Sequence, residues 1–109
     1  MGNGKGTTAG ADEMKIVILP SAMNDLVDGF LFYENQEERL GDYFWNSIFA
    51  DVDSLRIYGG IHRKVFGFHR LLAKKFPFAI YYAVESDKIF IRAVLDSRRD
   101  PKWIRQKLK

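Results

Sequence analysis

The spacing of apolar residues divides the chain into strands and helices. Residues 15–19 (KIVIL) are a short, mostly β-branched run that Pro20 closes, which predicts a first strand. Ser21 then stands at the position of a helix N-cap, and apolar residues recur at helical spacing as far as Tyr33. Gly29 is the weak point of this helix, because glycine has a low helix propensity. The polar residues 35–39 predict a break after it.

A second helix is predicted from residue 40 to about residue 58. One apolar stripe runs along it, made of Leu40, Phe44, Ile48, Val52 and Leu55. The polar residues between them, Asp42, Asn46, Asp51 and Asp53, are expected to face solvent. Gly59 and Gly60 provide a C-cap and a turn. Two helices joined by a short polar break predict an antiparallel helical hairpin.

After Gly60 the pattern changes to that of strands. Residues 65–70 alternate, residues 76–84 (FPFAIYYAV) are apolar throughout, and residues 89–95 (IFIRAVL) follow a turn at 85–88. These segments predict a meander of three antiparallel strands. Asp100 and Pro101 then predict the cap and first position of a short C-terminal helix. The predicted fold class is α+β, in the order strand, helix, helix, three strands and short helix.

Composition limits the class of protein. The 109 residues fit one domain, which we place at residues 14–109. Residues 1–13 (MGNGKGTTAGADE) predict a flexible extension, natural or left by cloning. No apolar run approaches the roughly 20 residues of a membrane span, and the start lacks a secretory signal pattern. With no cysteine and two histidines, we expect a cytoplasmic protein without a metal site or cofactor.

Charge is distributed unevenly between the two halves. Residues 14–61 hold three basic and eight acidic residues, a net charge of −5. Residues 62–109 hold thirteen basic and four acidic residues, a net charge of +9. A basic half in so small a domain indicates a surface that meets phosphates or an acidic protein.

Several segments together resemble the RelE/ParE superfamily of bacterial toxins. Residues 15–26 (KIVILPSAMNDL) resemble its opening strand and the entry to its helical hairpin. Residues 71–101 (LLAKKFPFAIYYAVESDKIFIRAVLDSRRDP) resemble its C-terminal sheet and arginine-rich end. The resemblance covers residues 14–108. It implies the toxin of a type II toxin–antitoxin (plasmid stabilisation) system, which a cognate antitoxin neutralises by wrapping an extended or helical segment over it.

Two activities occur in this superfamily. RelE-like members enter the ribosome and cleave mRNA without a metal, so their site must accept a proton, stabilise a phosphorane and protonate the leaving oxygen. By strand position, Arg70 matches their phosphate-binding arginine, and Arg98 or Arg99 matches their late arginine. The resemblance thus implies the candidate catalytic residues His69, Arg70, Lys74, Tyr82, Arg98 and Arg99. His69 and Arg70 are adjacent, so a regular strand points only one of them at a given site.

ParE-like members instead inhibit DNA gyrase and are not nucleases. After Arg99 the sequence has no Tyr or His, with which many nuclease members finish, and this favours the non-catalytic alternative. The candidates also have structural interpretations: Tyr82 as a core residue, His62 as a solvated loop residue, and Arg99 as an ion-pair partner of Asp96 or Asp100. Convergence of Arg70, Lys74 and a late arginine would favour the nuclease. Scattered charges on a filled sheet would favour a protein-binding inhibitor, and a degraded toxin-like domain is a third possibility.

Overall fold

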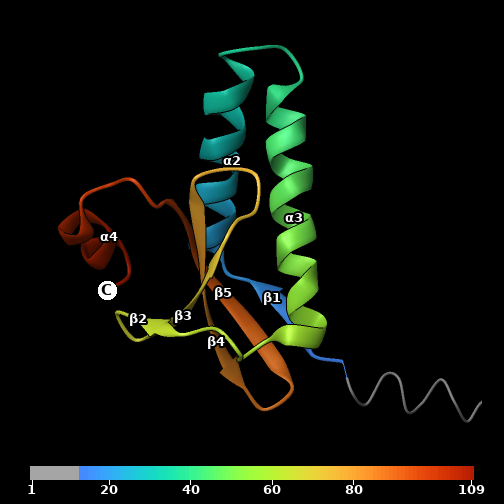
Figure 1. The fold of residues 1–109 in the computed structure, drawn as a ribbon, viewed down its shortest axis with the longest axis vertical. Helices are drawn as coiled ribbons and strands as arrows, with labels where there is room; N and C mark the ends of the chain where they lie inside the picture. Colours follow the sequence, from blue (N-terminus) through green and yellow to red (C-terminus); the bar gives the residue numbers. More distant parts are fainter. Residues whose placement is uncertain (1–12) are drawn as a thin grey trace, which may run out of the picture.

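The structure is a computed structural model that describes residues 13–109 (Figure 1). Its elements are, in order, β1 (Lys15–Ile18), α2 (Pro20–Glu34), α3 (Leu40–Tyr58), β2 (Lys64–Val65), β3 (Phe68–Leu72), β4 (Phe78–Glu85), β5 (Lys88–Asp96) and α4 (Pro101–Lys107). This order confirms the predicted α+β class. The extension predicted for residues 1–13 lies, apart from Glu13, outside the described residues.

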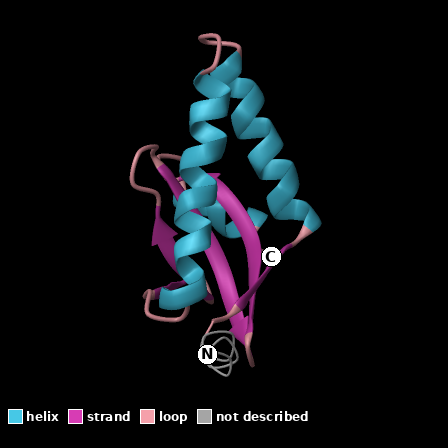
Figure 2. Ribbon diagram, turned by 90° about the vertical axis from the view of Figure 1, so that its right-hand side faces the viewer, coloured by secondary structure: helices cyan, strands magenta, loops and turns pink. Residues whose placement is uncertain are grey.

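One five-stranded sheet has the order β1-β5-β4-β3-β2. β1 pairs with β5 in parallel, and the other neighbours are antiparallel. The hairpin of α2 and α3 covers one face of this sheet, whereas α4 lies against the opposite face (Figures 1 and 2). The structure has four strands where the sequence predicted a three-stranded meander. The additional strand arises because residues 64–72 fold back on themselves at Phe66 and Gly67.

The main core lies between the helical hairpin and the sheet. Phe44 of α3 is fully buried there, and its ring lies 5.2 Å from Tyr33, 5.2 Å from Phe76 and 5.0 Å from Phe78, measured between centroids. A Cβ atom on Gly29 would stand 2.5 Å from Cζ of Phe44. Gly29 therefore allows α2 to approach the Phe44 ring, which explains a glycine in the middle of a helix.

A second, smaller core lies under α4. Ile104 and Leu108 are buried against Ala79, Tyr81, Ala93 and Leu95 of β4 and β5. The predicted start of this helix is confirmed: Pro101 occupies its first turn, and Oδ1 of Asp100 accepts the Lys102 N–H at 2.8 Å. The outer face of β4 is consequently filled by α4.

Two local predictions are wrong. Ser21 is not the N-cap of α2, since the helix begins at Pro20 and the Ser21 hydroxyl donates to the Arg92 carbonyl at 2.8 Å. Asp51 does not face solvent but is only 5% exposed, and its Oδ2 accepts the Lys74 N–H at 3.1 Å. Both side chains satisfy backbone groups of the sheet and its loops, which lie far away in sequence.

Candidate functional site

His69 and Tyr82 lie together on the sheet face that the helical hairpin covers. They are register partners on β3 and β4, and their rings stack with centroids 5.0 Å apart and planes at 24°. Tyr82 is fully buried. Of the residues predicted as candidates, this pair is the one that the sheet brings into direct contact.

His62 adds a third ring to this pair, so its interpretation as a solvated residue is wrong. Its Nδ1 lies 2.6 Å from the Tyr82 hydroxyl, which also accepts the Gly60 N–H at 3.0 Å. Nδ1 of His69 lies 2.5 Å from the His62 carbonyl. Because a carbonyl only accepts, His69 carries a proton on Nδ1. We refer to His62, His69 and Tyr82 as the His–Tyr cluster.

Burial favours the neutral forms of Tyr82 and His62 in the His–Tyr cluster. Burial raises the pKa of Tyr82, against the opposing effect of the N–H groups that it contacts. Burial, with a smaller contribution from His69, lowers the pKa of His62. A buried phenol with a raised pKa is a poor base at neutral pH. The cluster is therefore suited to tying the loop after α3 to the sheet.

The lowered pKa of His62 predicts a stability that depends on pH. As the pH falls below about 6.5, His62 takes up a proton more readily in the unfolded state than in the folded state. The free energy of unfolding should therefore be highest above about pH 6.5 and decline below it. Urea unfolding between pH 8 and pH 5 should show this decline, and His62→Gln should reduce it. An equal decline in His62→Gln would assign it to other groups.

Arg70 lies on the opposite face of the sheet. Its register partner is Tyr81, which is 1% exposed beneath α4. Arg70 itself is half-buried. Since neighbouring residues of a strand alternate between faces, Arg70 and His69 point away from each other, as the sequence predicted.

Lys74, Arg98 and Arg99 lie toward one end of the sheet, where β3 and β5 finish. Asp96 pairs with Arg98, through contacts of 2.7 and 3.0 Å, and not with Arg99 as the sequence suggested. This bond from Arg98 lowers the pKa of Asp96. Arg99 instead stacks on Trp103, with its guanidinium carbon 3.8 Å from the ring centroid. Both late arginines thus have partners within the chain.

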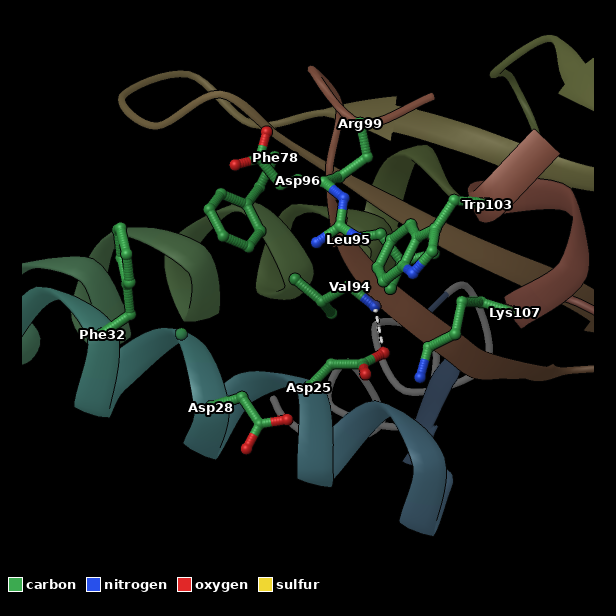
Figure 3. Close-up of a pocket in the computed structure, with 11 residues that line it drawn as sticks. Asp25, Asp28, Phe32, Phe78, Val94, Leu95, Asp96, Arg99, Trp103 and Lys107 are labelled. Atoms are coloured by element: carbon green, nitrogen blue, oxygen red, sulfur yellow. Dashed lines mark hydrogen bonds between the residues drawn. The ribbon is translucent and has the colours of Figure 1, made fainter. Parts of the chain in front are cut away.

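A hollow of about 320 Å³ separates α2, the end of β5 and α4 (Figure 3). Arg99 and Lys107 line it together with the carboxylates Asp25 and Asp28. Asp25 accepts the Val94 N–H at 3.0 Å, and burial raises its pKa. The carboxylates in this hollow would repel a phosphate and offset the attraction of the two cations, so the hollow is poorly suited to bind one.

Two further features of the described residues concern metal ligands and membrane-spanning helices. Within residues 13–109, no group of three or more His, Asp or Glu side chains is placed to hold a metal ion. In the same range, no helix is both long and apolar enough to cross a membrane.

Comparisons with known proteins support the fold. No family model matches the sequence, and no curated protein matches it. Among solved structures, the chain is similar to one in "Chromosomal ParDE TA system from P. aeruginosa", with a TM-score of 0.67 and 20% identity. The match covers 76% of this chain and 95% of that chain.

The chain has a RelE/ParE-like fold. The fold predicted from the resemblance is thereby confirmed. The order of strand, two helices, meander and short helix is the part of the prediction that this comparison supports, because 20% identity carries no residue roles with it.

Within this RelE/ParE-like fold, the candidate residues occupy separate places. His69 and Tyr82 lie under the helices, Arg70 lies on the α4 face, and Arg98 and Arg99 follow β5. Asp96, which precedes the late arginines, pairs with Phe78 on β4. Phe78 and Tyr82 are four positions apart on that strand, which is a distance of about 13 Å. The structure therefore brings His69 and Tyr82 together but does not gather Arg70 or the late arginines around them.

Sequence reasoning did not predict the roles of His62 and Gly60 in the His–Tyr cluster. The contact between His62 and Tyr82 joins positions 20 residues apart, across a loop whose path no periodicity specifies. The signal that was present is the paired glycines before His62, which allow the chain to turn back toward the sheet.

Proposed function

We propose that the chain is the toxin of a type II toxin–antitoxin system and that it acts by binding a protein target such as DNA gyrase. The observation that carries this proposal is that Arg70 and the His–Tyr cluster lie on opposite faces of the sheet. Metal-independent RNA cleavage needs a base, an acid and phosphate ligands around one phosphate. The RelE/ParE-like fold supports the toxin class, and the placement of Arg70 away from the His–Tyr cluster supports binding over cleavage.

A cognate antitoxin is the partner that this proposal requires. Met23, Val27 and Leu31 are spaced four apart on α2 and are 36%, 41% and 50% exposed. They form an apolar stripe beside a hollow that Val27, Phe30, Asp42 and Trp45 line. Such a stripe fits a helical segment that lays its own apolar face along it. We propose that the antitoxin covers this face of the helical hairpin.

A ribosome-dependent endoribonuclease is the second candidate function. Arg70 favours it, because this arginine lies on the outer face of β3 at the strand position expected for a phosphate ligand. On this hypothesis the mRNA would have to reach Arg70 beside α4.

Induction of the chain in a bacterial host separates these functions. We expect growth arrest with intact transcripts and accumulated DNA breaks, and inhibition of gyrase supercoiling by the purified chain. The Arg70→Ala variant should retain at least part of the arrest, since no chemical step depends on one arginine.

Two outcomes would contradict the proposal. In-frame mRNA cuts at ribosome-occupied positions that vanish in Arg70→Ala would establish the ribonuclease instead. Normal growth with a folded, well-expressed chain would remove the toxin claim and leave only the fold. The double variant Met23→Lys, Leu31→Lys tests the antitoxin surface when it is expressed together with a candidate antitoxin. The variant should still arrest growth, but the antitoxin should no longer neutralise it.

A further inference from the structure

The turn between β2 and β3 combines two unfavourable features in one residue. Phe66 and Gly67 form a two-residue loop between the paired residues Val65 and Phe68, with φ values of 55° and 88°. Such loops favour Asn-Gly, because both positions need a positive φ. A bulky residue in this region is an outlier, and Phe66 is also 42% exposed. Strain of this kind gathers at functional sites.

The surroundings of Phe66 are basic. It lines a hollow of about 310 Å³ with Arg105, Leu108 and Lys109, at the place where the C-terminus comes close to β2 (Figure 1). Two of these residues carry a positive charge. Arg63, whose carbonyl accepts the Arg70 N–H at 3.0 Å, precedes the turn on the β2 side and is exposed. The exposed ring therefore lines this hollow with two cationic side chains, and Arg63 precedes it by three residues.

The end of the chain is held in place beside this ring. Arg92 donates to the carbonyl oxygens of Lys107 at 3.2 Å and Lys109 at 2.9 Å. Leu108 is buried at 6% exposure between these two residues. Arg105 and Lys109 thus project from a fixed backbone, which reduces the entropy lost when they meet a ligand.

We propose that Phe66, with Arg63, Arg105 and Lys109, forms a contact site for single-stranded nucleic acid. Phe66 stacks on an unpaired base, and the cations contact the phosphates on either side. An exposed aromatic side chain among cations is the usual arrangement for such strands, because every base offers a face for stacking. This site is separate from the His–Tyr cluster and does not depend on the toxin function.

Substitution at Phe66 separates recognition from a structural role. Phe66→Asn removes the ring and installs the residue that the turn prefers, so its thermal midpoint should be equal to or above that of the wild type. Its affinity for a labelled single-stranded RNA or DNA of about 12 nucleotides, measured by fluorescence anisotropy, should fall by about five- to a hundredfold. Phe66→Trp should bind like the wild type.

Two further variants serve as controls. Phe32→Ala removes another aromatic side chain, 54% exposed on α2, and should leave the affinity unchanged. Arg105→Ala should reduce the slope of log affinity against log salt by about 0.7, as expected for the loss of one phosphate contact on a single strand.

Three results would overturn the proposal. One is wild-type affinity in Phe66→Asn, which would show that the ring makes no contact. Another is a lower thermal midpoint in Phe66→Asn, which would show that the ring packs structurally. The third is competition by polyglutamate as strong as that by the unlabelled oligonucleotide, which would assign the surface to an acidic polypeptide. All three use the purified chain, so they are distinct from a failure of growth arrest.

Discussion

Replacing Phe44 with alanine is expected to lower the free energy of unfolding by about 3–5 kcal/mol. Its side chain is fully buried, and three aromatic rings surround it: Tyr33 from α2, Phe76 from the loop before β4 and Phe78 from the start of β4. Truncation leaves a cavity between rigid rings that collapse poorly around it. A domain of this size is stabilised by only about 5–15 kcal/mol, so the variant would be close to unfolding.

Urea unfolding followed by circular dichroism measures this loss. The matched control is Phe32→Ala, also on the helical hairpin but 54% exposed, for which we expect a change of about 0.5 kcal/mol. Equal losses in the two variants would contradict the assignment of the main core to the Phe44 side of the hairpin.

Gly29 supplies a second test of the same contact. In the wild type, Gly29→Ala should be destabilising by about 1–3 kcal/mol, because the added methyl meets the Phe44 ring. In the Phe44→Ala background the ring is gone, and the higher helix propensity of alanine should make the same substitution stabilising by up to about 1 kcal/mol. A double-mutant cycle without this reversal of sign would argue against close packing at Gly29.

The fold could be predicted because each element has a pattern of its own. The stripe from Leu40 to Leu55 has helical period, and the run from Phe78 to Val84 is apolar enough for a strand covered on both faces. The β2–β3 turn was missed because Phe66-Gly67 lacks the polar first residue that usually marks it.

The site could be predicted only in part, because its contacts depend on tertiary structure. Alternation along β3 correctly placed His69 and Arg70 on opposite faces. It could not indicate which of the adjacent residues Arg98 and Arg99 would pair with Asp96, since both follow the last strand in an irregular turn. Nor could the helical stripe reveal that Asp51 is buried, because the group it contacts comes from a loop 23 residues later.

Replacing the buried Asp51 is the second substitution expected to have a large effect on stability. Oδ2 of Asp51 accepts the Lys74 N–H in the loop that carries Phe76 into the core against Tyr33, Tyr43 and Phe44. Asp51→Ala removes the acceptor and leaves an unpaired N–H near the core, at a cost of about 1–3 kcal/mol. It should also release the loop, so that hydrogen exchange at the Lys74 amide accelerates more than exchange in β4.

The matched variant is Asp51→Asn, which keeps an oxygen acceptor in a side chain of the same shape. Its unfolding free energy and Lys74 exchange should stay much closer to those of the wild type, because the hydrogen bond survives without the charge. If Asn and Ala were equally destabilising, the carboxylate charge would be what holds the loop. If neither accelerated exchange at Lys74, the bond would contribute nothing to the position of this loop, and Phe76 packing alone would account for it.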